Sequence, residues 1–110
     1  MEIKDIDKCR IITLFSPKLT EHEADRLKEE LELGGGKRIG IDMSYVRDYT
    51  IHFINELIGI KDISLFNIQS DIFAIFTSME LDKSLKLFVS EPDFLENKHR
   101  LLNRKFSIVS

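Results

Sequence analysis

Apolar residues along this chain follow two spacings, one typical of strands and one typical of helices. Short runs rich in β-branched and aromatic residues predict strands, at residues 2–6, 9–15, 37–44, 63–68 and 85–89. Between them apolar residues recur every three or four positions, which predicts helices, over residues 20–33, 50–60, 70–79 and 90–102. The tail, residues 105–110, is compatible with one more short strand. Such alternation favours right-handed crossovers and a largely parallel sheet.

Local signals mark where these elements begin and end. Thr20 and Glu23 have the spacing of a capping box, which predicts the start of the first helix. The glycines at 34–36 predict its end. Thr50 stands where an N-cap would open the second helix. Gly40, in the middle of the central strand, leaves open whether that strand is buried on both faces.

Length and composition indicate one domain over residues 1–110. A chain of 110 residues with 43% hydrophobic residues can build one continuous core, but not two. The 16 basic and 19 acidic residues are nearly balanced, so we expect no nucleic-acid partner. The single cysteine, Cys9, excludes an internal disulfide and favours a reducing cytoplasm. Neither a signal peptide nor a run of membrane-spanning length is evident, so we expect no direct membrane insertion.

The sequence offers little for catalysis or metal binding. The three histidines, His22, His52 and His99, are far apart along the chain, and the one cysteine has no neighbour that would activate it. No catalytic triad can be assembled with any specificity. We therefore expect a protein that is not an enzyme and that needs neither a metal nor a cofactor.

Three segments resemble one known family. Lys37–Val46 (KRIGIDMSYV) ends a strand in Asp-hydrophobic-Ser, followed by a spacer and Val; Leu14–Thr20 (LFSPKLT) leads from a strand into a helix, and Ile63–Ser70 (ISLFNIQS) does the same later. In these segments the chain resembles the STAS family, that of anti-sigma factor antagonists. The resemblance implies an α/β fold with a four- to five-stranded, mixed, mostly parallel sheet and about four helices largely on one face. It also implies that the loop before the second helix docks an anti-sigma factor with serine kinase activity, or a related partner.

The same loop departs from the family pattern. Many members carry Asp-Ser-Ser-Gly there, and one of these serines is phosphorylated to break the complex, whereas residues 47–53 read RDYTIHF. If Asp48 matches the family aspartate, Tyr49 falls on the modified serine and Thr50 on the next hydroxyl. A gap-free match from Asp42 places Ile51 there instead. The usual switch serine therefore has no evident counterpart.

We predict a regulatory module that binds its partner through the loop and helix start at 48–54. The predicted contact residues are Asp48, Tyr49, Thr50, Ile51, Phe53 and Ile54. Thr50 is the candidate phosphorylation site, with an ordinary capping role as the alternative, and Asp48 either caps the helix or recognises the partner.

Two other functions stay open. The chain could be a constitutive scaffold subunit of a signalling or membrane-transporter assembly, or an enzyme with a deep polar pocket near Ser44 and Asp48. Homodimer formation is also left open by the sequence.

Overall fold

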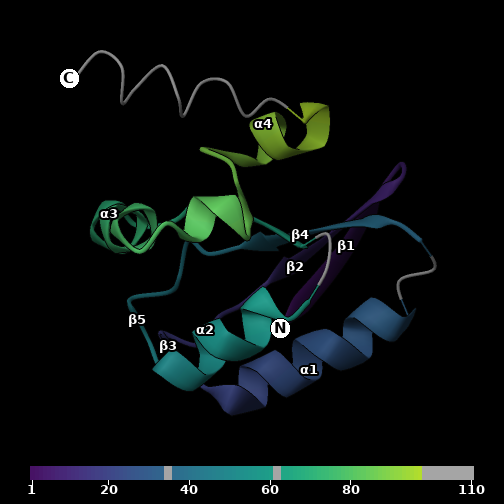
Figure 1. Ribbon diagram of the computed structural model, residues 1–110. Helices are drawn as coiled ribbons and strands as arrows, with labels where there is room; N and C mark the ends of the chain where they lie inside the picture. Colours follow the sequence, from purple (N-terminus) through teal and green to yellow (C-terminus); the bar gives the residue numbers. More distant parts are fainter. Residues whose placement is uncertain (34–35, 61–62, 98–110) are drawn as a thin grey trace.

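The structure is a computed structural model that describes residues 1–33, 36–60 and 63–97. Among these residues, five strands form one sheet in the order β1-β2-β4-β6-β7 (Figure 1). Their bounds are β1 Glu2–Ile6, β2 Cys9–Thr13, β4 Arg38–Asp42, β6 Ile63–Phe66 and β7 Lys86–Leu87. β1 runs antiparallel to β2, and every other neighbouring pair is parallel. The predicted mixed, mostly parallel sheet is confirmed.

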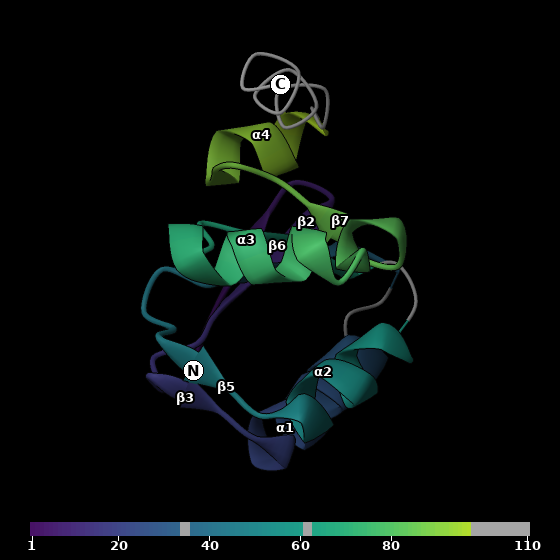
Figure 2. The ribbon, with the colours of Figure 1, turned by 60° about the vertical axis from the view of Figure 1, so that its left-hand side comes forward.

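The described helices lie on both faces of this sheet. They are α1 Glu21–Leu33, α2 Ile51–Ile58, α3 Ser70–Ser78 and α4 Glu91–Glu96, with a 3-10 turn at Leu81–Lys83. α1 and α2 run side by side below the sheet and α4 lies above it (Figure 2). The buried residues of α3 belong to the same core as those of α1 and α2, so the helices are largely on one face, as expected. The second half of the last predicted helix, and the predicted tail strand, lie in residues 98–110, outside the described residues.

Most predicted strands are shorter in the structure. The strand predicted at 9–15 ends at Thr13, because Leu14 and Phe15 already belong to the loop that turns away from the sheet. That loop leads into β3 (Lys18–Leu19), which pairs in parallel with β5 (Asp48–Tyr49). The sequence pattern missed both, since a strand of two residues shows no periodicity.

The main core lies between the sheet and the helices below it. Register pairs Ile12 with Ile41, Ile41 with Leu65 and Leu65 with Leu87, so four buried aliphatic side chains form a row across four strands. Each contributes about 1.5–3 kcal/mol by leaving water. Buried residues of α1, α2 and α3 cover this row: Ala24, Leu27, Phe53, Ile54, Leu57, Ile72 and Phe76.

The opposite face of the sheet holds a smaller aromatic core. Phe94 of α4 stacks on Phe66 with ring centroids 5.4 Å apart and meets Phe88 edge-on at 5.7 Å. The Arg38 guanidinium lies 4.7 Å from the centroid of the Phe94 ring. A Cβ at Gly40 would come within 2.6 Å of that ring, so the glycine makes room for α4. The central strand is therefore buried on both faces, which settles the point left open by its sequence.

Polar contacts fix the start of α1 and join α1 to α2. Glu23 accepts hydrogen bonds from the Thr20 amide (2.9 Å) and hydroxyl (2.6 Å), which confirms the start of α1. Partial burial works to raise the pKa of Glu23, but the hydrogen bonds from Thr20 outweigh it and lower the pKa. Lys28 and Glu56 form an ion pair between α1 and α2.

Candidate partner-binding site

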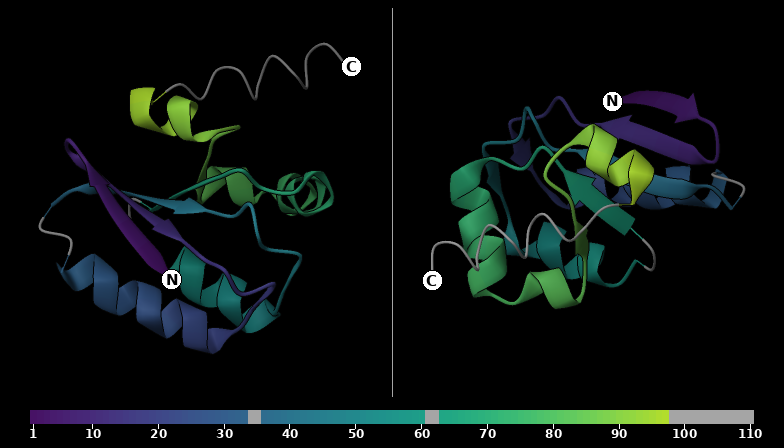
Figure 3. Two further views of the ribbon diagram at one scale, coloured as in Figure 1. Left: turned by 180° about the vertical axis from the view of Figure 1, so that it is seen from behind. Right: turned by 90° about the horizontal axis from the view of Figure 1, so that it is seen from above.

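The predicted docking loop leaves the sheet at the edge where its parallel strands end. β2, β4 and β6 all run toward this edge, so the segments that follow Thr13, Asp42 and Phe66 meet there (Figure 3). In open parallel sheets this edge is the usual place for binding sites. The segment from 43 to 50 connects β4 to α2 and carries three of the six residues predicted to contact a partner; the other three lie on α2.

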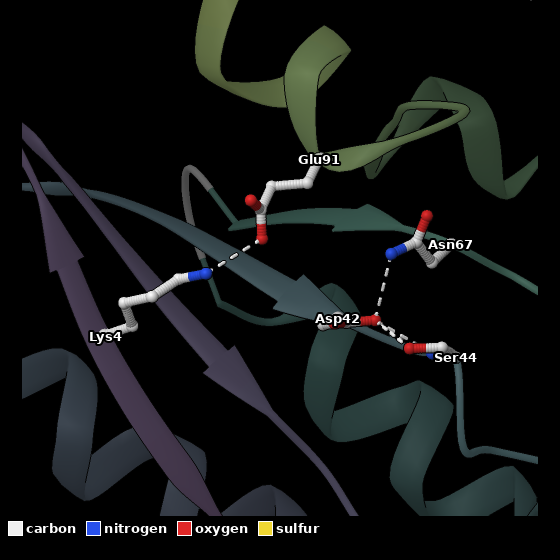
Figure 4. Close-up of polar contacts among 5 residues, drawn as sticks. All are labelled: Lys4, Asp42, Ser44, Asn67 and Glu91. Carbon is white, nitrogen blue, oxygen red and sulfur yellow. Dashed lines mark hydrogen bonds and ion pairs between the residues drawn. The ribbon is translucent and has the colours of Figure 1, made fainter.

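Asp42 anchors the start of this segment (Figure 4). Its Oδ1 accepts a hydrogen bond from the Ser44 amide (3.0 Å), another from the Ser44 hydroxyl, and a third from Asn67 Nδ2 (3.2 Å). Gln69 Nε2 donates to the Ser44 carbonyl at 2.8 Å. Asn67 has a φ of 56°, a left-handed conformation that asparagine tolerates better than most residues. This Asp42 network ties the exit of β4 to the exit of β6.

The next residues alternate between core and surface. Met43 and Val46 are buried, whereas Tyr45 is 52% exposed. The Tyr45 ring lies 5.0 Å, centroid to centroid, from that of Phe15, which is 46% exposed. The Pro17 carbonyl accepts from the amides of residues 47 and 48 at 2.7 and 2.9 Å, so the loops after β2 and β4 are fastened together. The exposed aromatic pair thus has a rigid support.

Asp48 and Tyr49 differ in exposure. Asp48 is exposed and its carboxylate lies 3.8 Å from Lys18 Nζ, a solvated pair that contributes little to stability. Tyr49 is half-buried and meets Phe76 of α3 edge-on, with ring centroids 5.3 Å apart. Burial, and then the charge of Asp48, raise the pKa of Tyr49, so its phenol stays neutral at physiological pH.

Thr50 caps α2. Its Oγ1 accepts a hydrogen bond from the Phe53 amide at 3.2 Å, and its own amide donates to the Leu19 carbonyl at 2.9 Å. The capping role predicted for Thr50 is confirmed. Asp48 does not cap this helix; its Oδ1 accepts instead from the Tyr49 amide at 2.8 Å.

The apolar residues of the predicted contact set separate into surface and core. Ile51 is 55% exposed, whereas Phe53 is 0% and Ile54 is 1% exposed. The prediction of partner contact was wrong for the side chains of Phe53 and Ile54, because the face of α2 that carries them packs against the sheet and α1. Partner contact by the remaining four, Asp48, Tyr49, Thr50 and Ile51, stays a prediction.

Three further features of the described residues concern metal binding, cavities and membrane-spanning helices. No three His, Cys, Asp or Glu side chains there are grouped to hold a metal ion. A cavity of about 170 Å³ lies beside Phe15 and one of about 530 Å³ lies beside Cys9, and neither is lined by Ser44 or Asp48. Within the described ranges, no helix has the length and apolar character needed to cross a bilayer.

Removing the Asp42 carboxylate is expected to loosen the segment that follows it. Asp42→Ala leaves three donors of Ser44 and Asn67 without their acceptor, so the free energy of unfolding should fall by about 1–3 kcal/mol. Amide hydrogen exchange of residues 43–50 should accelerate more than that of β4. Asp42→Asn keeps one oxygen acceptor, so its free energy of unfolding should fall by less. Equal effects of the two variants would show that the Asp42 network is not what holds the loop.

Sequence patterns missed two features of this site. Asn67 and Gln69 join Asp42 only because β6 lies beside β4, and Phe15 joins Tyr45 only because the two loops cross the same edge. Two sequence features could have pointed to these residues: polar residues directly after buried strands, and aromatic residues in otherwise polar loops.

Comparisons with known proteins concern the fold. No protein-family profile matches this chain, and no curated protein sequence matches it. Among solved structures, a candidate anti-sigma factor antagonist from Thermotoga maritima superposes with a TM-score of 0.70 at 17% identity, over 87% of this chain and 92% of that chain. The STAS-like fold implied by the sequence resemblance is therefore confirmed.

Proposed function

We propose that this chain is a non-enzymatic regulatory module that binds a protein partner through the surface around Asp48, Tyr49, Thr50 and Ile51. One observation carries the proposal: Ile51 is 55% exposed on the first turn of α2, directly after the capping Thr50. An isoleucine exposed beside charged and hydroxyl groups suits the apolar centre of a small protein interface.

The STAS-like fold suggests the kind of partner. The structural neighbour is described as an anti-sigma factor antagonist, and an ATP-binding anti-sigma factor of the serine kinase type is the partner we propose for this chain. The cavities beside Phe15 and Cys9 are not lined by Ser44 or Asp48, the residues near which an enzyme would need its polar pocket. Binding, without catalysis, accounts for these features.

We further propose Thr50 as the switch position. A phosphate on its hydroxyl would lie at the N-terminus of α2, where backbone donors and the helix dipole stabilise negative charge. The same phosphate would stand next to Ile51 and add charge and bulk to an apolar contact. Phosphorylation would thus leave the fold intact and weaken the complex.

Thr50→Asp separates charge from loss of the cap. Asp is as good an N-cap as Thr, so α2 should remain capped while the surface gains a negative charge. We expect binding of the kinase-type partner to weaken by at least about tenfold, because an unpaired charge is costly to bury in an interface. Ser70→Asp adds the same charge to the first turn of α3 and serves as the matched control.

Affinity capture from the native lysate, with mass spectrometry, provides the measurement. An ATP-binding partner retained by wild type and Ser70→Asp, but not by Thr50→Asp, would support the proposal, as would phosphate found on Thr50 in the native protein. Equal capture by all three proteins would rule out Thr50 as a switch and favour the constitutive scaffold. Capture of no kinase-type partner by wild type would contradict the proposed function.

A further inference from the structure

A small cavity lies beside the exposed aromatic pair, between α1 and the loop after β2. It has a volume of about 170 Å³, and its polar wall is formed by Ser16, His22, Glu23 and Arg26. His22 and Arg26 are one helical turn apart, so their side chains extend from the same face of α1. Phe15 belongs both to the cavity wall and to the pair with Tyr45.

The unpaired side chains in the wall of this cavity, those of His22 and Arg26, offer hydrogen-bond donors. Among the described residues, the side chains of His22 and Arg26 have no hydrogen-bond or ion-pair partner. Arg26 carries only donors, and the imidazole of His22 offers at least one in either protonation state. The carboxylate of Glu23 is already occupied by the amide and hydroxyl of Thr20. A group that enters should therefore accept hydrogen bonds and carry negative charge.

The size of the cavity limits what can enter. Sites for small molecules usually measure about 300–1,000 Å³, whereas this cavity of about 170 Å³ has room for one side chain. The rings of Phe15 and Tyr45 next to it expose an apolar surface, and aromatic residues on a rigid support are typical of interface hot spots. A ligand with a carboxylate beside an apolar side chain would match both the donors in the cavity and the apolar surface of the two rings.

We propose that this cavity receives the carboxylate side chain of an acidic residue of the partner protein, while a neighbouring apolar side chain of the partner lies on Phe15 and Tyr45. The inference rests on the proposed function, because it names the chemistry by which the partner is recognised. Arg26 provides the charge that selects the acidic residue, and Tyr45 provides the apolar contact. Specificity thus comes from a surface beyond the loop at 48–51.

Two blocked dipeptides test this proposal on the full chain. N-acetyl-Glu-Phe-amide carries both features, and N-acetyl-Gln-Phe-amide differs only in lacking the charge. In amide NMR titrations we expect saturable shifts at Ser16, His22 and Tyr45 with the Glu dipeptide. The Gln dipeptide should bind about fivefold more weakly, which is the upper range for an exposed ion pair.

Variants of surface residues test separately the charge supplied by Arg26 and the apolar contact supplied by Tyr45. Arg26→Gln should abolish the difference between the dipeptides, and Tyr45→Ala should weaken both alike. Ile75→Ala removes a similarly exposed apolar side chain from α3 and should change the binding of neither dipeptide. Because these positions are exposed, the amide spectra of the variants should retain the wild-type dispersion.

Several results would overturn the proposal: equal binding of the two dipeptides to wild type, no saturable shift at these residues, or a preference for Glu that survives Arg26→Gln. None of them involves Thr50, so the proposed function would remain to be judged by the capture experiment. Conversely, a Thr50→Asp variant that binds its partner normally would remove the switch and leave this site unaffected.

Discussion

Replacing Phe53 by Ala should lower the free energy of unfolding by about 3–5 kcal/mol, enough to threaten the folded state of a domain of this size. The ring is fully buried and belongs to the core between α2, α1 and the sheet. Its removal creates a cavity that neighbouring side chains can fill only in part. Urea denaturation followed by circular dichroism gives the change directly.

Ile51→Ala is the matched comparison on the same helix. Because Ile51 is 55% exposed, its truncation should change stability by less than about 0.5 kcal/mol and act on partner binding instead. The two variants together separate core from docking surface. A Phe53→Ala protein that kept its stability but lost its partner would restore Phe53 to the contact set and contradict the burial described above.

Gly40→Ala should cost about 1–3 kcal/mol, the usual penalty for overpacking. The new methyl group would come within 2.6 Å of the Phe94 ring, which is held between Phe66, Phe88 and the guanidinium of Arg38. The ring cannot withdraw without opening these contacts. Chemical denaturation should show the loss, together with faster amide exchange in α4.

Gly59 supplies the control for this substitution. It follows α2 with a φ of −72°, and the nearest neighbour of a Cβ there would be the Glu56 carbonyl oxygen at 3.4 Å, an ordinary contact. Gly59→Ala should therefore be neutral or stabilising by about 0.4–1 kcal/mol. In the Gly40→Ala background, Phe94→Leu should cost less than in wild type, since the smaller side chain relieves the overlap. Additive effects of the two substitutions would show that α4 does not pack on Gly40.

The order of strands and helices could be predicted from the sequence because the signals are local. Apolar periodicity distinguished α1 to α3 from the strands, and the caps at Thr20 and Thr50 marked helix starts to within a residue. The strand-helix alternation then restricted the sheet to a mostly parallel arrangement. The resemblance to the STAS family added the expectation that the helices lie largely on one face of the sheet.

The composition of the docking surface could not be predicted in the same way. Six apolar residues between 51 and 60 cover more than half of a helical surface, and periodicity cannot tell which of them face outward. That depends on where α1 and the sheet lie, which buries Phe53 and Ile54 and leaves Ile51 exposed.

The sequence by itself determined the local structure of this protein: which segments form the strands of the main sheet, where helices begin, and that the sheet is mostly parallel. Only the tertiary structure decided which residues meet. It brought Asn67 to Asp42, Phe15 to Tyr45 and Phe94 to Gly40. The physical reason is that periodicity and capping act within a few residues, whereas burial and polar contacts depend on surfaces that distant segments supply.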